Sequence, residues 1–147
     1  VGWDYSRWYA TADTYPQNAV RGPIVMVTNQ WAGSDGDIVA AATQAMGYAK
    51  VIGERSWGGV VGIDGRFDLV DGTSVTQPRY AGWYGSYGWG VENHGVDPDI
   101  VVTVSPEDWE ADRDVQLDAA IAECLRQLDD KPAATAPELP GPAFDRC

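Results

Sequence analysis

The sequence predicts an α/β fold with a mostly parallel sheet. Three consecutive segments support this prediction: an apolar run at 23–28, an alanine-rich segment at 38–46 and a second apolar run at 50–53. Such apolar runs are typical of strands buried on both faces, and alanine favours helix. A strand, a helix and a strand in this order form a β-α-β unit, in which the strands are parallel and the crossover is right-handed.

The first 19 residues contain several tryptophans and tyrosines without a clean period. We therefore expect residues 1–19 to be an irregular, aromatic-rich segment that lies against a core or a partner. A polar, glycine-containing turn at 29–37 follows the first predicted strand. Gly47 stands where a left-handed C-terminal cap would end the predicted helix.

The middle of the chain is richer in glycine. Residues 57–62 contain too much glycine for a regular element and predict a loop in close contact with another part of the molecule. Asp71-Gly72, between alternating apolar runs at 66–70 and 74–77, predicts a hairpin. An aromatic loop with interspersed glycines follows at 80–90.

The last part of the chain predicts a strand and two helices. A third strand is expected at 100–104. Ser105 suits the N-cap of a helix and Pro106 suits its first position. Residues 115–128 space their apolar side chains for one buried face of a C-terminal helix.

These elements predict one globular domain at 20–130. The segment 131–147 is rich in proline, and we expect it to be a disordered tail. The chain begins with Val rather than Met, so we also expect it to be a piece of a longer protein.

Composition excludes several classes of function. The chain has 147 residues, with 22 Asp and Glu, 10 Lys and Arg, and one His, which gives a formal net charge of −12 at pH 7. A strongly acidic surface repels nucleic acid and anionic bilayers. No apolar stretch approaches the roughly 20 residues that a membrane helix requires. We therefore expect no nucleic-acid partner and no membrane span.

Metal and cofactor chemistry are not indicated either. One His excludes the usual multi-His zinc sites within this chain, and Cys124 and Cys147 give no disulfide framework. We expect no metal and no cofactor. Chemistry would then depend on Ser, Asp, Glu or the single His, and acids such as Asp37 near a cleft would favour cationic substrates.

Ser34 is the most informative candidate, because it stands in a glycine-flanked turn between a predicted strand and a predicted helix. A serine at such a turn points out of the sheet, and the unpaired N–H groups of the helix start can hold an oxyanion. The backbone N–H of Asp35 would be one such donor. The alternative is a plain N-cap, since Ser and Asp are preferred capping residues.

Glu92 and His94 lie together in the loop before the third predicted strand. Glu92 could orient a catalytic base or cap a turn. His94 could complete a triad with Ser34 and an acid, or be a surface histidine. The seven tryptophans could line a peptide groove, or serve as core and interface anchors.

Three separated blocks, at 29–37, 52–63 and 90–100, carry a family resemblance. Their order and content resemble the tricorn-type members of the tail-specific (C-terminal-processing) serine peptidase family, at the second catalytic subdomain. The match covers residues 20–104, and three ordered blocks are more specific than one.

The resemblance implies a ClpP/crotonase-like α/β fold. It also implies that Ser34 is the nucleophile, that the Asp35 N–H is an oxyanion donor and that Glu92 belongs to the catalytic charge relay. In this family the general-base His lies in an upstream subdomain, followed by a PDZ domain, and this argues against His94. Peptide substrates, a homo-oligomer and a cytoplasmic location are further expectations from the family.

The expected function is therefore that of a serine endopeptidase. It would hydrolyse short peptides through an acyl-enzyme on Ser34, with the base supplied by His-bearing and PDZ-like segments upstream in the same polypeptide. The chain alone would then be incomplete and inactive. The alternative is a non-catalytic peptide-binding or assembly module of the same fold, which the aromatic loop at 80–90 would suit.

Overall fold

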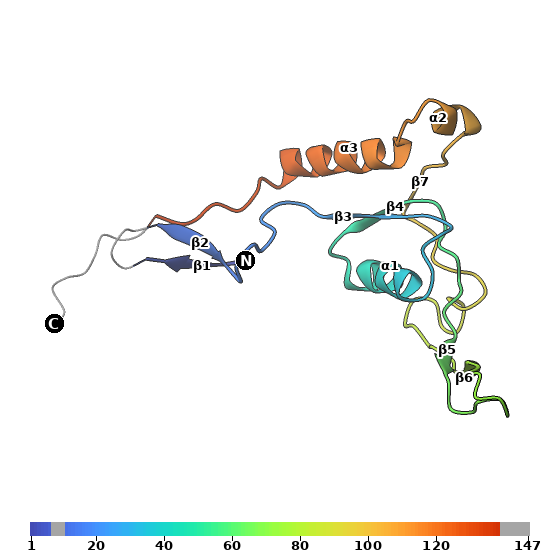
Figure 1. Ribbon diagram of the computed structural model, residues 1–147. Coiled ribbons are helices and arrows are strands. Elements are labelled where there is room, and N and C mark those ends of the chain that lie inside the picture. The colour runs from blue at the N-terminus through green and yellow to red at the C-terminus, as the bar shows by residue number, and fades with distance from the viewer. Residues whose placement is uncertain (7–10, 139–147) are drawn as a thin grey trace, which may run out of the picture. The chain divides into compact units, whose positions relative to one another are not determined.

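The computed structural model describes residues 1–6 and 11–138 (Figure 1). The chain divides into two compact units, one of residues 25–123 and the other of residues 1–24 with 124–147. Each unit is described by itself. In the part of the chain that the structure describes, no helix is both long enough and apolar enough to cross a membrane.

A three-stranded parallel sheet forms the centre of the 25–123 unit. Its strands are β3 (Val25–Thr28), β4 (Lys50–Gly53) and β7 (Ile100–Val101), in the order β3-β4-β7. Both pairs are parallel. The predicted α/β fold with a mostly parallel sheet is therefore confirmed.

The third strand is shorter than the predicted 100–104. Gly53 ends β4 with a positive φ of 124°. The Val102 N–H still donates to the Gly53 carbonyl at 2.8 Å, but β4 offers no partner beyond that point. Pairing therefore stops at Val101 because the neighbouring strand has ended.

Helix α1 (Asp35–Met46) connects β3 to β4 and begins three residues before the predicted start at 38. It ends as expected at Gly47, where φ is 64° and the N–H donates to the carbonyls of Thr43 and Gln44. Alanines of α1 pack on the sheet and on the loops beyond it. The buried core consists of Ala40, Ala41, Val51, Val60, Val91 and Val96.

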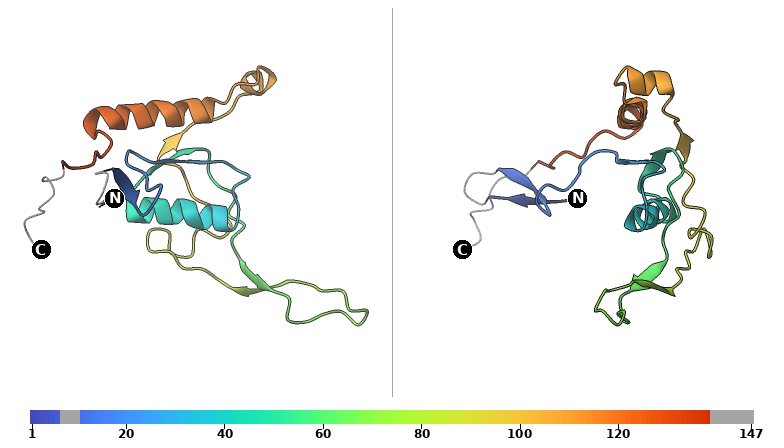
Figure 2. Two further views of the ribbon diagram at one scale, coloured as in Figure 1. Left: turned by 60° about the vertical axis from the view of Figure 1, so that its left-hand side comes forward. Right: turned by 45° about the vertical axis from the view of Figure 1, so that its right-hand side comes forward.

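A hairpin of β5 (Gly62–Asp64) and β6 (Gln77–Tyr80) extends from this unit (Figure 2). Its turn is at the predicted Asp71-Gly72, where the Asp71 carboxylate accepts the Thr73 N–H at 2.9 Å and this bond lowers the Asp71 pKa. The predicted strands at 66–70 and 74–77 were wrong. Only one bridge, Asp68 to Ser74, forms there, because no second layer covers the alternating apolar side chains.

The aromatic loop at 80–90 divides its side chains between core and surface. Tyr84 and Tyr87 pack against the core, whereas Trp83 and Trp89 are exposed. The Tyr87 hydroxyl donates to Gln44 Oε1 at 2.5 Å. Burial raises the Tyr87 pKa, and nearby carboxylates add to that effect. The loop is thus anchored to α1 while two of its tryptophans face solvent.

Two helices follow β7. Helix α2 (Pro106–Glu110) begins with a capping box: the Ser105 Oγ accepts the Asp108 N–H, and the Asp108 carboxylate accepts the Ser105 N–H, both at 3.1 Å. Helix α3 (Val115–Asp130) matches the predicted 115–128 helix and is two residues longer. Its Gln116 is buried and donates from Nε2 to the Val102 carbonyl at 2.9 Å.

The other unit contains an antiparallel hairpin of β1 (Gly2–Tyr5) and β2 (Ala12–Tyr15). The prediction of an irregular segment at 1–19 is therefore wrong at residues 2–5 and 12–15, and its residues 7–10 lie outside the described residues. Side chains in both strands alternate between exposed and half-buried positions, but each strand has only four residues, too few for the period of two to stand out in the sequence.

The beginning of the proline-rich tail belongs to the same unit. Residues 131–138 form no helix or strand, but the Ala134 N–H donates to the Arg21 carbonyl at 2.8 Å, and the Tyr5 hydroxyl donates to the Pro137 carbonyl. Residues 139–147, the rest of the predicted disordered tail, lie outside the described residues. The domain boundaries at 20 and 130 stay predictions.

Candidate active site

Ser34 occupies the turn between β3 and α1 in an unusual backbone conformation. Its φ is 54° and its ψ is −114°, a region that residues with a Cβ rarely adopt. The residue is exposed, and its hydroxyl makes no capping hydrogen bond. Ser34 thus has the N-cap position without the N-cap function, which leaves its Oγ free for another role.

The first backbone N–H of α1 lies next to this hydroxyl in sequence. Asp35 is the first residue of the helix, and its N–H has no acceptor among the described residues. The following N–H, that of Gly36, already donates to the Gly33 carbonyl at 2.9 Å. The Asp35 N–H is therefore a free donor at the positive end of a helix dipole.

The glycine-rich loop predicted at 57–62 lies within the sequence block at 52–63 and contacts the other two blocks, at 29–37 and 90–100. The Ser34 N–H donates to the Gly59 carbonyl at 3.1 Å, and the Asn93 N–H donates to the Gly58 carbonyl at 2.8 Å. The structure thus brings the blocks at 29–37, 52–63 and 90–100 together around the loop 56–59.

Two glycines allow this close approach of backbones. Gly58 and Gly95 have φ values of 84° and 87°. A Cβ on Gly58 would lie 2.6 Å from the Gly95 nitrogen, and a Cβ on Gly95 would lie 2.2 Å from the Ser56 carbonyl oxygen. Only glycine fits both the conformation and the space at these positions.

Asp37 is a buried carboxylate directly behind the Ser34 turn. It is 0% exposed, and its Oδ1 accepts the Ser56 hydroxyl at 2.5 Å and the Gly58 N–H at 2.8 Å. The expectation that Asp37 is an acid near a cleft is wrong, because its side chain faces inward. An acid in the first turn of a helix gives no sequence signal that separates the two cases.

Glu92 is half-buried in the loop that the Asn93 N–H ties to Gly58. The preceding Val91 is 0% exposed and belongs to the core, and Asn93 has a φ of 68°. The Glu92 carboxylate forms no hydrogen bond or ion pair with the described residues. It is therefore available to a partner.

His94 is engaged elsewhere. Its Nε2 lies 2.7 Å from Asp97 Oδ2, both side chains are mostly exposed, and its carbonyl accepts the Arg55 Nη1. No hydrogen bond joins His94 to Ser34 in the described part of the chain. The in-chain triad considered from the sequence therefore does not form in this structure.

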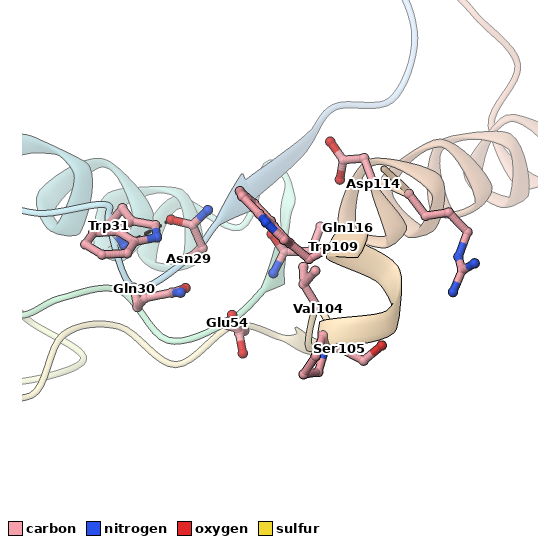
Figure 3. Close-up of a pocket in the computed structure, with 11 residues that line it drawn as sticks. Asn29, Gln30, Trp31, Glu54, Val104, Ser105, Trp109, Asp114 and Gln116 are labelled. Carbon is pink, nitrogen blue, oxygen red and sulfur yellow. Dashed lines mark hydrogen bonds between the residues drawn. The ribbon is translucent and has the colours of Figure 1, made fainter. Parts of the chain in front are cut away.

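A hollow of about 570 Å³ lies at the carboxyl ends of β3 and β4, where ligands bind in open α/β sheets (Figure 3). The segment from Asn29 to Trp31, which leads to Ser34, forms one side, and Trp109 of α2 forms another. Trp31 and Trp109 are 82% and 83% exposed. Trp109 is one of the seven tryptophans considered for a peptide groove, but nothing in the sequence singles it out.

Peptidase family S41 matches this chain over residues 4–102, more than half of its length. The chain belongs to peptidase family S41. This S41 chain is 58% identical over 140 residues to tricorn protease homolog 1 of Streptomyces coelicolor. It is 46% identical over 128 residues to the tricorn protease of Thermoplasma acidophilum.

Solved structures agree with this family. The crystal structure of the tricorn protease matches 88% of the S41 chain with a TM-score of 0.81 and 46% identity. The crystal structure of mature CPAF matches 79% with a TM-score of 0.62, and at 19% identity it supports the fold alone. The predicted family and fold class are confirmed.

The S41 chain spans only a small part of these relatives. The two alignments cover 95% and 87% of this chain, but 13% and 12% of the Streptomyces and Thermoplasma proteins. The structural match likewise covers 12% of the tricorn chain.

Proposed function

We propose that this chain is the nucleophile-bearing part of a serine endopeptidase that hydrolyses short peptides. The observation that carries the proposal is the exposed Ser34, held at a positive φ beside the unpaired Asp35 N–H. A strained serine at a strand-to-helix turn is the arrangement of a nucleophile elbow. Membership of peptidase family S41 supports the same reaction class.

In the proposed reaction, Ser34 Oγ attacks the scissile carbonyl carbon and gives its proton to a histidine. The tetrahedral oxyanion accepts the Asp35 N–H, a donor of a kind worth about 10²- to 10³-fold in kcat. The intermediate then expels the amine, which takes the proton from the histidine. Water hydrolyses the resulting acyl-enzyme with the same base.

The histidine of this reaction would come from outside the 147 residues. His94 is the one histidine of the chain, and its Nε2 is bonded to Asp97. The base would be supplied by a His-bearing segment, accompanied by a PDZ-like segment, upstream in the same polypeptide. Glu92, whose carboxylate has no partner among the described residues, would orient the relay from this side.

A non-catalytic peptide-binding or assembly module is the second candidate. It is favoured by the hollow at the sheet edge, where two tryptophans are more than four-fifths exposed, and by the exposed Trp83 and Trp89. Aromatic side chains of this kind anchor peptides. This candidate predicts peptide binding without turnover.

Ser34→Ala separates the two candidates. In the protein that joins this chain to its base, we expect the substitution to lower kcat by at least about 10⁴-fold while peptide binding persists. Steady-state kinetics and a fluorescent-peptide titration measure the two effects. No turnover before the substitution would favour the binding module.

Labelling with a fluorophosphonate tests the origin of the base. We expect the 147-residue chain alone to label slowly at Ser34, and His94→Ala to leave that rate unchanged. Rapid stoichiometric labelling that His94→Ala abolishes would make His94 the base and contradict the proposal.

A homo-oligomer in the cytoplasm is part of the same proposal and rests on the family resemblance. Light scattering of the purified protein gives the oligomer size. Fractionation of the producing cells gives the compartment.

A further inference from the structure

We infer that Asp37 is a positioning residue for the Ser34 centre. Its buried carboxylate fixes the loop 56–59, and this loop holds both the Ser34 turn and the loop that carries Glu92. The inference rests on the proposed function, in which these two residues act together. It assigns a role to a buried group that the reaction does not otherwise use.

The Asp37 carboxylate is buried and depends on its hydrogen-bond donors. Asp37 is 0% exposed, and a buried carboxylate is tolerated only when donors satisfy it. Both of its bonds converge on Oδ1, from the Ser56 hydroxyl at 2.5 Å and the Gly58 N–H at 2.8 Å. Oδ2 has no hydrogen-bond partner among the described residues. Oδ1 alone therefore holds the loop 56–59.

Ser56 extends this contact to the segment after Glu92. Its hydroxyl donates to Asp37 and accepts the Val96 N–H at 2.8 Å. Its backbone N–H donates to the Val96 carbonyl at 3.1 Å. Ser56 is 2% exposed, so water does not compete for these bonds.

The carbonyls of the same loop bind the two arms of the site, which are the Ser34 turn and the loop that carries Glu92. The Gly58 carbonyl accepts from Asn93, the neighbour of Glu92, and the Gly59 carbonyl accepts from Ser34 itself. Asp37 holds Gly58 by its N–H, so the carboxylate, the loop and both arms form one continuous set of bonds.

An apolar residue at position 37 would fill the space without holding the loop. The Ser56 hydroxyl and the Gly58 N–H would then be buried donors without an acceptor, which favours a shift of the loop. A shift of about 1 Å between reacting groups can cost about 100-fold in rate.

Amide hydrogen exchange on the 147-residue chain tests the inference without catalysis. We expect Asp37→Ala to speed exchange at the Ser34 and Asn93 amides at least tenfold more than at Ile52, a 0% exposed residue of β4. Asp37→Asn keeps an acceptor oxygen and should exchange within threefold of the wild-type rate at both amides. Equal acceleration at all three amides would show global destabilisation and overturn the inference.

Thr43→Val is the matched control. Thr43 is another buried polar residue of α1, 1% exposed, and its hydroxyl bonds to Tyr48 and Met26 rather than to the loop. We expect it to lower stability without selective exchange at Ser34 or Asn93. If Asp37→Ala does not fold, Ser56→Ala takes its place, with a smaller but still selective acceleration expected, because the Gly58 N–H can still donate to Asp37.

Kinetics of the protein that includes the base give the second readout. We expect Asp37→Ala to lower kcat about 100-fold with KM within threefold, and Asp37→Asn to restore most of kcat. An unchanged kcat, or an Asp37→Asn variant as impaired as Asp37→Ala, would overturn the inference. The proposed function would be contradicted by a different result, a Ser34→Ala variant whose kcat equals that of the wild type.

Discussion

At the scale of single residues, the site depends on backbone conformations that carry strain. Ser34 and Asn93 have φ values of 54° and 68°, and such conformations cost on the order of 1–3 kcal/mol each for residues with a Cβ. They persist because the N–H of each is bonded to the loop 56–59. The strain therefore lies in the Ser34 turn and in the Glu92 loop, and the hydrogen bonds to the Gly58 and Gly59 carbonyls offset it.

Gly95→Ala tests the space behind these arms. The new Cβ would lie 2.2 Å from the Ser56 carbonyl oxygen at a φ of 87°, so backbone must move. We expect the free energy of unfolding to fall by about 3 kcal/mol or more, measured by urea denaturation.

Gly47→Ala is the control for Gly95→Ala. Gly47 also has a positive φ, but nothing lies within 4 Å of an added Cβ. Gly47→Ala should therefore lower the free energy of unfolding only by the cost of a positive φ for alanine, about 1 kcal/mol. Equal losses in the two variants would mean that the close approach at Gly95 contributes nothing.

The sequence allowed Ser34 and Asp35 to be located, because a strand, a turn and a helix place them together. Their roles remain predictions. It did not reveal Asp37, because a buried acid and a solvent-facing acid in the first turn of a helix look alike. It also left His94 open, since the bond to Asp97 depends on how the loop folds.

At the scale of elements, α2 is a five-residue helix that depends on its start. Asp108 accepts from Ser105 and from Arg113, and these bonds hold the pKa of its carboxyl below the ordinary value, with the Ser105 bonds the larger cause. A carboxyl with a lowered pKa in the folded state stabilises that state above the unfolded pKa, and loses this effect as pH falls through the folded pKa.

Asp108→Asn should therefore lower the thermal midpoint at pH 7, and the difference from wild type should shrink below about pH 4. Thermal unfolding between pH 7 and pH 2.5 measures this. Asp130→Asn is the control, because its ion pair with Arg126 is mostly exposed and should matter little at either pH. A difference that does not change with pH would contradict the assignment.

Elements with a buried apolar pattern or a clear start signal were predictable, and α2 was located from Ser105 and Pro106 although it buries no residue. β3, α1 and β4 pack on one another, so burial agrees with their sequence pattern. For the β5-β6 hairpin, the turn was predicted correctly but the strands were not, since no second layer covers the alternating apolar side chains between 66 and 77. The β1-β2 hairpin escaped detection because four-residue strands give too few alternations.

At the scale of the whole molecule, the core lies within one of the two units. All members of the central cluster fall between Ala40 and Val96, and the only other buried hydrophobic residues described are Ile52 and Ala120. The 25–123 unit therefore holds the apolar burial that drives folding.

A fragment of residues 20–130 should fold by itself, with one cooperative urea transition. We expect its circular dichroism to keep the helix signal of α1 and α3, because the core residues are all present. Gradual unfolding without a transition would show that residues 1–19 or 131–147, which the fragment lacks, are required for folding. This result would contradict the predicted domain boundaries.

The arrangement around the loop 56–59 also bears on how the site could change. Two successive carbonyls of this loop accept the Ser34 and Asn93 N–H groups, so the Ser34 turn and the Glu92 loop share one support. A double-mutant cycle across the arms should therefore be non-additive. A substitution within residues 56–59 would therefore move the Ser34 turn and the Glu92 loop together. A substitution in the β5-β6 hairpin would leave the distance between them unchanged.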